Sequence, residues 1–310
     1  MAISSWPVRL VLLLLGGATF EASARWWCSE HRYHHRYVDT NRDPYGINKG
    51  FWYAHIGWLI ARRDREIGFE NVKDLDKDPL ILWQHRYYLP LAILFCFGLP
   101  TGIAALWGDP WGGLVVAGFA RLVCVQHFTW CINSVAHTFG RQTYSDRHSA
   151  KDSGLMAFFT YGEGYHNFHH EFPSDYRNGH RWYHWDPAKW LIRCLAFLRL
   201  SRGLRQTERE KILQARLLME RKRMTERLAV HTAALPMAAE VIDHALAHLQ
   251  SAASRWMALK AEYAQLKRTG LQSIADRVNE LRREMHQARR EFRRAISTWK
   301  LLIRQPLPVM

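Results

Sequence analysis

The sequence has few cysteines and none of the patterns in which cysteine usually binds a metal or builds a disulfide framework. Five cysteines occur in 310 residues, an odd number, and no two of them form a Cys-x-x-Cys pair. Three of the five lie in apolar stretches. This pattern predicts reduced cysteines that serve in packing, and a site that faces the cytosol.

Acidic residues are also scarce relative to basic ones. The chain has 43 Lys and Arg against 28 Asp and Glu, and its formal net charge is +15. The last 110 residues hold 22 basic and 11 acidic residues, so most of the excess lies there. Such an excess suggests contact with anionic lipid, an acidic ligand or nucleic acid. Zinc-finger, RNP-like and Gly-rich phosphate-loop patterns are missing, so we do not expect a nucleic-acid partner.

Two long apolar runs, residues 87–107 and 111–130, are present. Each is long enough to cross a bilayer, which needs about 20 residues, and each is flanked by Tyr or Trp. Only Gly108-Asp109-Pro110 separates them, which predicts a helical hairpin; the alternative is a pair of buried helices in a soluble protein. Arg121 inside the second run should face protein or reach toward the interface.

A shorter apolar run at residues 7–20 is too brief to span a membrane. It resembles the core of a signal peptide, but no convincing small-residue cleavage site follows it. We therefore expect an interfacial or buried helix there.

Histidine is abundant, and one histidine pattern occurs twice. The two copies are His31-Arg-Tyr-His34-His35 and His166-Asn-Phe-His169-His170. In a helix, positions i, i+3 and i+4 share one face, so the three imidazoles of each copy can converge on a metal. The alternative is a pair of polar helix faces that happen to be rich in histidine.

Asn133 and His137 add a further i, i+4 pair directly after the second apolar run. Seven histidines exceed the four ligands of a tetrahedral zinc, so the set suits two metal ions. Imidazole binds zinc, copper, nickel and iron, and spacing alone does not choose among them.

A membrane hairpin returns the chain to the side that it left, so all these residues should lie at one membrane face. Basic residues precede and follow the hairpin, whereas its short turn carries none, which predicts that this face is cytosolic. An all-imidazole dinuclear site there favours oxygen-activating iron chemistry.

These motifs resemble those of the membrane acyl-CoA desaturases of the stearoyl-CoA delta-9 type. The resemblance rests on His31-x-x-His34-His35, Asn133-Ser-Val-Ala-His137 and His166-Asn-x-His169-His170. The flanking sequence is similar too: Arg25-Trp26-Trp27, Asp39-Thr-x-x-Asp43-Pro44-Tyr45, His55-x-Gly57-Trp58, Gly162-Glu163-Gly164-Tyr165 and Glu171-Phe172-Pro173-Ser174-Asp175-Tyr176-Arg177. It runs from Trp6 to Leu200, nearly two-thirds of the chain.

The resemblance implies an all-α, multi-pass integral membrane protein with a cytosolic, histidine-rich di-iron domain, in the endoplasmic reticulum or a bacterial inner membrane. Its two iron ions and dioxygen would place a cis double bond in a saturated fatty acyl-CoA. The iron ligands would be His31, His34, His35, His137, His166, His169 and His170, with Asn133 acting through a bound water. Trp27, Thr129 and Trp130 match positions that shape the acyl tunnel, and Arg62 and Arg63 match a basic pair near the CoA phosphates. For the tryptophans the alternative role is interfacial anchoring, and for the arginines it is topology-setting charge.

The resemblance also implies elements that this sequence lacks. The family pattern begins with a His-x-x-x-x-His box and a transmembrane hairpin, whereas His31 is the first histidine here. Because a metal site needs its full ligand set, we expect the polypeptide as written to be inactive or weakly active. A start placed too late or a fragmentary sequence would explain this most simply; a degenerate paralogue that serves as a scaffold is another explanation.

One alternative concerns the reaction, and a further expectation concerns the electron donor. A membrane fatty-acid or alkane hydroxylase uses a similar histidine-rich di-iron site. No His-Pro-Gly-Gly haem loop occurs, so electrons would come from a separate cytochrome b5 or ferredoxin with its reductase. The basic tail could dock such an acidic partner.

We expect two domains, a desaturase core at residues 1–200 and a basic helical extension at residues 201–310. Leu235-Pro236 should divide the extension into two helical arms, the second running to about Lys300. Apolar residues at helical spacing suggest a packed seam in that arm: Leu259, Tyr263, Leu266, Leu271, Ile274, Val278 and Leu281.

Overall fold

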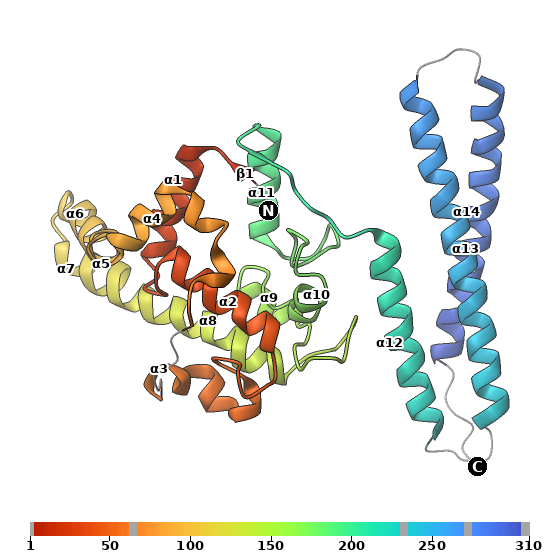
Figure 1. Cartoon of the computed structure of the whole chain (residues 1–310), viewed down its shortest axis with the longest axis horizontal. Coiled ribbons are helices and arrows are strands. Elements are labelled where there is room, and N and C mark those ends of the chain that lie inside the picture. Colours follow the sequence, from red (N-terminus) through yellow and green to blue (C-terminus); the bar gives the residue numbers. More distant parts are fainter. Residues whose placement is uncertain (1–2, 62–66, 230–234, 270–274, 305–310) are drawn as a thin grey trace. The chain divides into compact units, whose positions relative to one another are not determined.

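The computed structural model describes residues 3–61, 67–229, 235–269 and 275–304. The chain forms two compact units, one of residues 1–142 and 146–206 and the other of residues 143–145 and 207–310. Helices dominate both units (Figure 1), which confirms the predicted helical class. One small departure is a pair of two-residue antiparallel strands, β1 (Ile3–Ser4) and β2 (Ser201–Arg202), with Ser4 opposite Ser201.

The first two helices lead into the first histidine triplet. Helix α1 (Trp6–Gly17) has 12 residues; its side chains Val11, Leu12 and Leu15 are exposed, whereas Gly17 and Ala18 at its end are buried. Helix α2 (Ala24–Tyr37) begins where the Ser23 hydroxyl accepts a hydrogen bond from the backbone N–H of Trp26. Such an N-cap stabilises a helix by about 1 kcal/mol.

Short helical segments connect α2 to the apolar hairpin. They are η1 (Ile47–Lys49), η2 (Tyr53–Gly57), α3 (Trp58–Ile60), η3 (Glu70–Val72), η4 (Leu75–Lys77) and α4 (Pro79–Arg86). Helix α4 is fixed to the start of α2, because the Gln84 side chain accepts from the Ala24 N–H at 3.1 Å and His85 Nδ1 lies 2.6 Å from the Ser23 hydroxyl. The orientation of α2 therefore depends on contacts made some 60 residues later in the chain.

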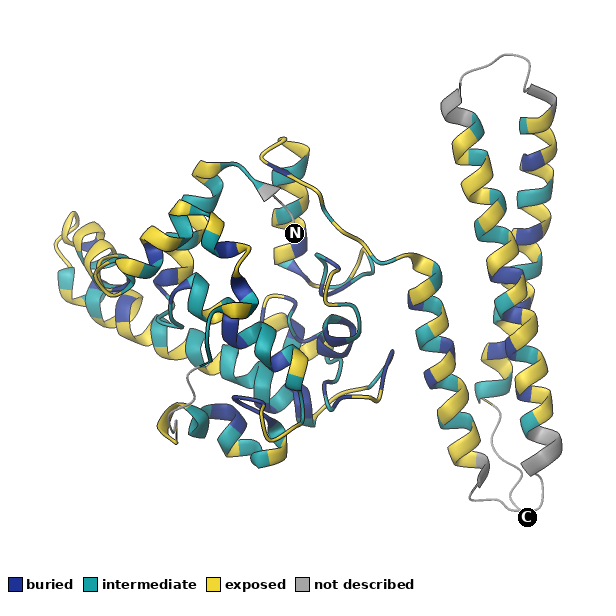
Figure 2. Cartoon of the chain, in the orientation of Figure 1, coloured by how far each residue is buried: buried dark blue, intermediate teal, exposed yellow. Residues whose placement is uncertain are grey.

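The predicted hairpin is present as two long helical rods. The first consists of α5 (Tyr88–Ile93), η5 (Leu94–Gly98) and α6 (Leu99–Ala105), and the second of α7 (Pro110–Gly112), η6 (Gly113–Ala120) and α8 (Arg121–Thr138). Both are long and apolar enough to cross a membrane. In the most apolar 18-residue stretch of each rod, 17% is buried in the first rod and 6% in the second (Figure 2). Rods with so little burial are not core helices of a soluble protein.

The second rod continues beyond the predicted end at Trp130. Helix α8 runs without a break to Thr138, so Asn133 and His137 belong to the rod itself and do not follow it. In this rod Arg121 faces protein, because its guanidinium donates to the Ala18 carbonyl at 3.1 Å and to Cys96 Sγ at 2.9 Å. All five cysteines are free.

The second histidine triplet lies on a short helix held from several sides. The elements after α8 are α9 (Gly154–Phe159), α10 (His166–Glu171) and α11 (Pro187–Phe197). Helix α10 is positioned by Asn167, whose side chain donates to the Ala150 carbonyl at 2.9 Å, and by Asp152, which accepts from the Phe168 N–H at 3.1 Å. Asn167 is fully buried, so its hydrogen bond is costly to break.

In the described residues of the second unit the helices are α12 (Arg209–Ala229), α13 (Leu235–Thr269) and α14 (Ala275–Arg304). Its core consists of Leu217, Ile242, Leu246, Leu249, Ala252, Ala295 and Trp299. The expected single arm from Leu235 to Lys300 is wrong, because α13 and α14 are separate helices and run antiparallel, with Arg255 paired to Glu291 and Glu262 to Arg277. The predicted seam positions Leu271 and Ile274 lie outside the described residues.

Close packing of the two rods at Gly113 can be tested by substitution. A Cβ atom at Gly113 would lie 2.5 Å from the Ala104 Cβ and 2.7 Å from the Pro100 carbonyl oxygen, whereas one at Gly102 would meet nothing within 4 Å. We expect Gly113→Ala to destabilise the protein by about 1–3 kcal/mol through overpacking. Thermal unfolding in detergent would measure this, with Gly102→Ala as the matched control. Equal melting temperatures for the two variants would contradict the packing seen here.

Candidate metal centre

Three helices bring all seven predicted histidines together. Helix α2 carries His31, His34 and His35, α8 carries His137, and α10 carries His166, His169 and His170. They divide into two groups, and within each the potential ligand nitrogens lie within 4.8 Å of one another. We call these the four-histidine cluster (His34, His137, His166, His170) and the three-histidine cluster (His31, His35, His169).

The four-histidine cluster is compact and draws on all three helices. Its Nε2 atoms are separated by 3.3 Å between His34 and His170, 3.1 Å between His170 and His166, and 3.0 Å between His166 and His137. All four side chains are buried. Convergent ring nitrogens at this spacing match the coordination of one metal ion by several imidazoles.

The three-histidine cluster adjoins the first. His35 Nε2 lies 3.2 Å from His31 Nε2 and 2.9 Å from His169 Nε2. The His35 ring also stacks on His170 of the other cluster, with ring centroids 4.3 Å apart. The two groups therefore adjoin each other and form one continuous set of seven imidazoles.

Hydrogen bonds behind the rings determine which nitrogen faces the centre. His34 Nδ1 lies 2.9 and 3.0 Å from the two carboxylate oxygens of Asp43, which is fully buried. A carboxylate only accepts hydrogen bonds, so Nδ1 carries the proton and Nε2 presents a lone pair. This carboxylate–histidine arrangement orients imidazoles at metal sites.

His137 is fixed in the same way through a hydroxyl. Its Nδ1 lies 2.7 Å from the Ser149 hydroxyl, which donates to Asp39 Oδ1 and must therefore accept from His137. The other Asp39 oxygen accepts from the Ser149 N–H at 2.6 Å, and Asp39 has a positive φ of 62°. Two bare Nε2 lone pairs, from His34 and His137, thus point into one buried cluster. The three Nε2 contacts of this cluster cannot all be hydrogen bonds: if His170 donates to His34 and His166 donates to His137, two N–H groups face each other across the 3.1 Å contact between His166 and His170. A cation bound by the four lone pairs removes this conflict, so the residues fit a bound metal.

Burial keeps the imidazoles in the form that binds metal. Desolvation lowers the pKa of His31, His35, His166 and His170 below the ordinary value, and the neighbouring imidazoles lower it further. Burial also lowers the pKa of His169, although Glu163 opposes this. These groups are therefore neutral at pH 7, as metal ligation requires.

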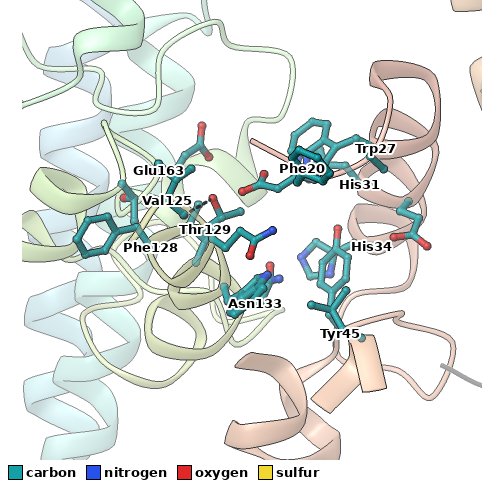
Figure 3. A pocket seen from close by; sticks show the side chains of 18 of the residues that line it. Phe20, Trp27, His31, His34, Tyr45, Val125, Phe128, Thr129, Asn133 and Glu163 are labelled. Carbon is teal, nitrogen blue, oxygen red and sulfur yellow. Dashed lines mark hydrogen bonds between the residues drawn. The ribbon is translucent and has the colours of Figure 1, made fainter. Parts of the chain in front are cut away.

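A cavity of about 980 Å³ opens beside both clusters (Figure 3). His31, His34, His166 and His169 form part of its wall. Much of the remaining wall is apolar or aromatic, from α2, the first rod, α8 and α9. In Figure 3, Thr129 and Asn133 of α8 face Trp27, His31 and His34 of α2 across the cavity.

Most of the other predicted site residues line this cavity. Trp27, Thr129, Trp130 and Asn133 are all in its wall, and Trp27 stacks on His31 with ring centroids 4.6 Å apart. The Thr129 hydroxyl donates to the Val125 carbonyl of its own helix at 3.1 Å. Arg62 and Arg63 lie outside the described residues.

Sequence analysis gave no role to several residues that the structure places at the centre. The supporting pair of Asp39 and Ser149 joins segments 110 residues apart, so no local pattern could reveal it. His148 is a further buried histidine, 5.1 Å from His170 between ring centroids, and neither of its ring nitrogens has a hydrogen-bond partner. Glu21 lines the cavity, and burial raises the pKa of its carboxyl.

Comparisons with known proteins agree with these motifs. The family model described as fatty acid desaturase matches residues 3–203. The chain is 44% identical over 223 residues to the Schizosaccharomyces pombe protein named "Probable acyl-CoA desaturase", covering 71% of this chain and 46% of that protein. It is 42% identical to acyl-CoA desaturase 1 of Saccharomyces cerevisiae, covering 72% and 44%, and 34% identical to stearoyl-CoA desaturase of Sus scrofa, covering 70% and 61%. The chain thus spans about half the length of these relatives.

The hydrogen bond between Asp43 and His34 predicts that metal affinity depends on Asp43, although Asp43 is not itself a candidate ligand. Asp43→Asn replaces an obligate acceptor by an amide that can also donate, so His34 loses the partner that fixes its tautomer. We expect metal affinity to fall about 10- to 100-fold. Competition with a chelator would measure the change, using Asp74→Asn, which removes a surface partner of Arg32, as the control. Unchanged affinity in Asp43→Asn would contradict the assigned tautomer.

Proposed function

The chain belongs to the fatty acid desaturase family, and we propose that it removes two hydrogens from a saturated fatty acyl-CoA to leave a cis double bond of the delta-9 type. The observation that supports this most strongly is the pair of adjoining histidine clusters in the wall of one large, mainly apolar cavity. A metal centre beside an apolar cavity suits oxidation of a hydrocarbon chain.

Two iron ions are the metals that we propose, one in each cluster. The four-histidine cluster would hold one ion and the three-histidine cluster the other, with Asn133 acting through a bound water. Iron bound there would supply the power to activate dioxygen for hydrogen removal from an unactivated methylene pair. The balanced reaction consumes one dioxygen, two electrons and two protons, and it yields the alkene and two waters.

The protein's own residues would bind and orient the acyl chain. Trp27 and Trp130 offer flat apolar surfaces to methylene groups and exclude water from the centre. Thr129 presents its side chain to the middle of the cavity, where it would limit the path of the chain (Figure 3). Arg62 and Arg63 would pair with CoA phosphates, for which guanidinium geometry is well suited.

The exposed apolar rods support a membrane location. We propose that they cross the bilayer as a hairpin, which places His31–His35 and His166–His170 at the same face, the cytosolic one. The fatty acyl chain would then enter from lipid, and the two electrons would come from cytochrome b5 or a ferredoxin with its reductase. The catalytic role falls to residues 1–200, and residues 201–310 form a separate helical extension.

Product analysis tests this function. Membranes containing the protein, supplied with stearoyl-CoA, dioxygen and a reducing system, should yield a mono-unsaturated acid, at the low rate expected of the sequence as written. We expect His137→Ala to lower the rate by about 100-fold or more, because it removes one imidazole of the four-histidine cluster. The control is His248→Ala, which alters an exposed histidine of α13. An alcohol product would instead indicate a hydroxylase, and iron loading without any product would indicate a scaffold that has lost the chemistry.

The two clusters should also differ in affinity for iron, because one offers four imidazoles and the other three. We expect anaerobic titration with ferrous iron to show one tight and one weaker equivalent, and activity to be low until the weaker site fills. His166→Ala should abolish the tight phase, whereas His31→Ala should leave it in place. Two equivalents of equal affinity in the unmodified chain would contradict this assignment.

A further inference from the structure

Helix α14 carries a row of basic side chains that the proposed chemistry does not use. With about 100° of rotation per residue, eight exposed basic residues fall within one arc of about 140°. We call this set the basic face: Arg282, Arg283, Arg289, Arg290, Arg293, Arg294, Lys300 and Arg304. It extends over about 33 Å at 1.5 Å per residue.

The charges on this helix are sorted by sign. Its described acidic side chains, Glu280, Glu284 and Glu291, lie on the side away from the centre of the basic face. There they take part in ion pairs with Arg277 and Arg255. Within the described residues, no recorded ion pair neutralises a member of the basic face, although Arg282 donates to the Tyr263 hydroxyl at 3.1 Å.

The buried side of α14 explains why the basic face is free. Leu281, Ala288, Ala295 and Trp299 are buried, and Ala295 and Trp299 belong to the core of the second unit. The described contacts of α14 with α12 and α13 are made by this apolar side and by the flanking ion pairs, and Arg282 is the member of the basic face that also contacts α13, through Tyr263. The opposite side remains for a partner outside this unit.

The composition of the basic face favours a phosphate-rich surface, and not a protein, as its binding partner. Seven of its eight members are arginine, and guanidinium binds phosphate oxygens through two parallel hydrogen bonds. Stable protein interfaces have an apolar, uncharged centre. Among the described side chains of α14, the large apolar ones that are exposed amount to Leu301 alone. A flat row of charges needs little shape complementarity to bind lipid headgroups.

We propose that the basic face binds the anionic phosphate headgroups of the membrane in which the chain's apolar hairpin sits. This inference rests on the membrane location in the proposed function, but it is independent of the desaturase chemistry. Because the chain itself is anchored in lipid, headgroups are always present at high local concentration. Attraction between basic helices and anionic lipid is electrostatic and weakens with salt.

Arginine footprinting of the full chain in lipid nanodiscs tests this. Phenylglyoxal modifies exposed guanidinium groups, and mass spectrometry reports the rate at each arginine. We expect the basic-face arginines to react at least about fivefold more slowly when phosphatidylglycerol forms about one third of the lipid than in phosphatidylcholine alone. About 0.5 M NaCl should remove the difference. Arg209 and Arg221 on α12 serve as internal references.

A matched pair of variants separates this face from general charge. In one, Arg289, Arg290, Arg293 and Arg294 become Gln; in the other, the same number of charges is removed from exposed α12 positions by changing Arg209, Lys211, Lys222 and Arg227 to Gln. The first variant should lose lipid-dependent protection of Arg282 and Arg283. The α12 variant should keep it.

Three other outcomes would contradict the proposed lipid binding. Equal reactivity in both lipids, in a chain that has entered the nanodiscs, would refute lipid binding and leave the desaturase proposal intact. Protection by added RNA or by an acidic electron carrier, without protection by phosphatidylglycerol, would assign the face to that partner. Failure of the chain to enter nanodiscs would refute the membrane location and this inference together.

Discussion

The arrangement of the first unit depends on one electrostatic constraint, the convergence of imidazole lone pairs in a buried place. Asp43 holds the His34 proton on the outer nitrogen, and Ser149 does the same for His137, so both inner nitrogens point at the same small volume. Without a cation this is unfavourable, because the three Nε2 contacts of the four-histidine cluster cannot all be satisfied as hydrogen bonds. The fold can tolerate it only if the surrounding hydrogen bonds are satisfied and rigid.

Much of the structure can be understood as support for that convergence. Asn167 and Asp152 hold the short helix α10, Gln84 holds the start of α2, and Asp39 holds the loop that presents Ser149. Each contact joins segments distant in the sequence. Short helices such as α10 are not stable alone, so tertiary hydrogen bonds must supply what helix propensity cannot.

Helix α8 links the three roles of the first unit. Its apolar outer surface forms part of the membrane-length rod, its Thr129 lines the cavity, and its His137 enters the four-histidine cluster. A single helix therefore sets the distance between the exposed apolar rod and the four-histidine cluster. Because the cavity lies along this helix, a hydrocarbon chain bound there would pass beside both clusters.

The sequence by itself determined the helical class, the hairpin and the ligand types, because these follow from local patterns: apolar run length and the i, i+3, i+4 spacing of histidines. It also located the cavity residues Trp27, Thr129 and Trp130 through resemblance to a family. Only the tertiary structure decided how seven histidines divide into clusters of four and three, and that α13 and α14 are separate helices. It also decided which groups fix the ring tautomers. The reason is physical: a helix face is set by residues three or four apart, but the partner of an imidazole nitrogen is whichever group folding brings within about 3 Å, and in Asp39 and Ser149 that partnership spans 110 residues.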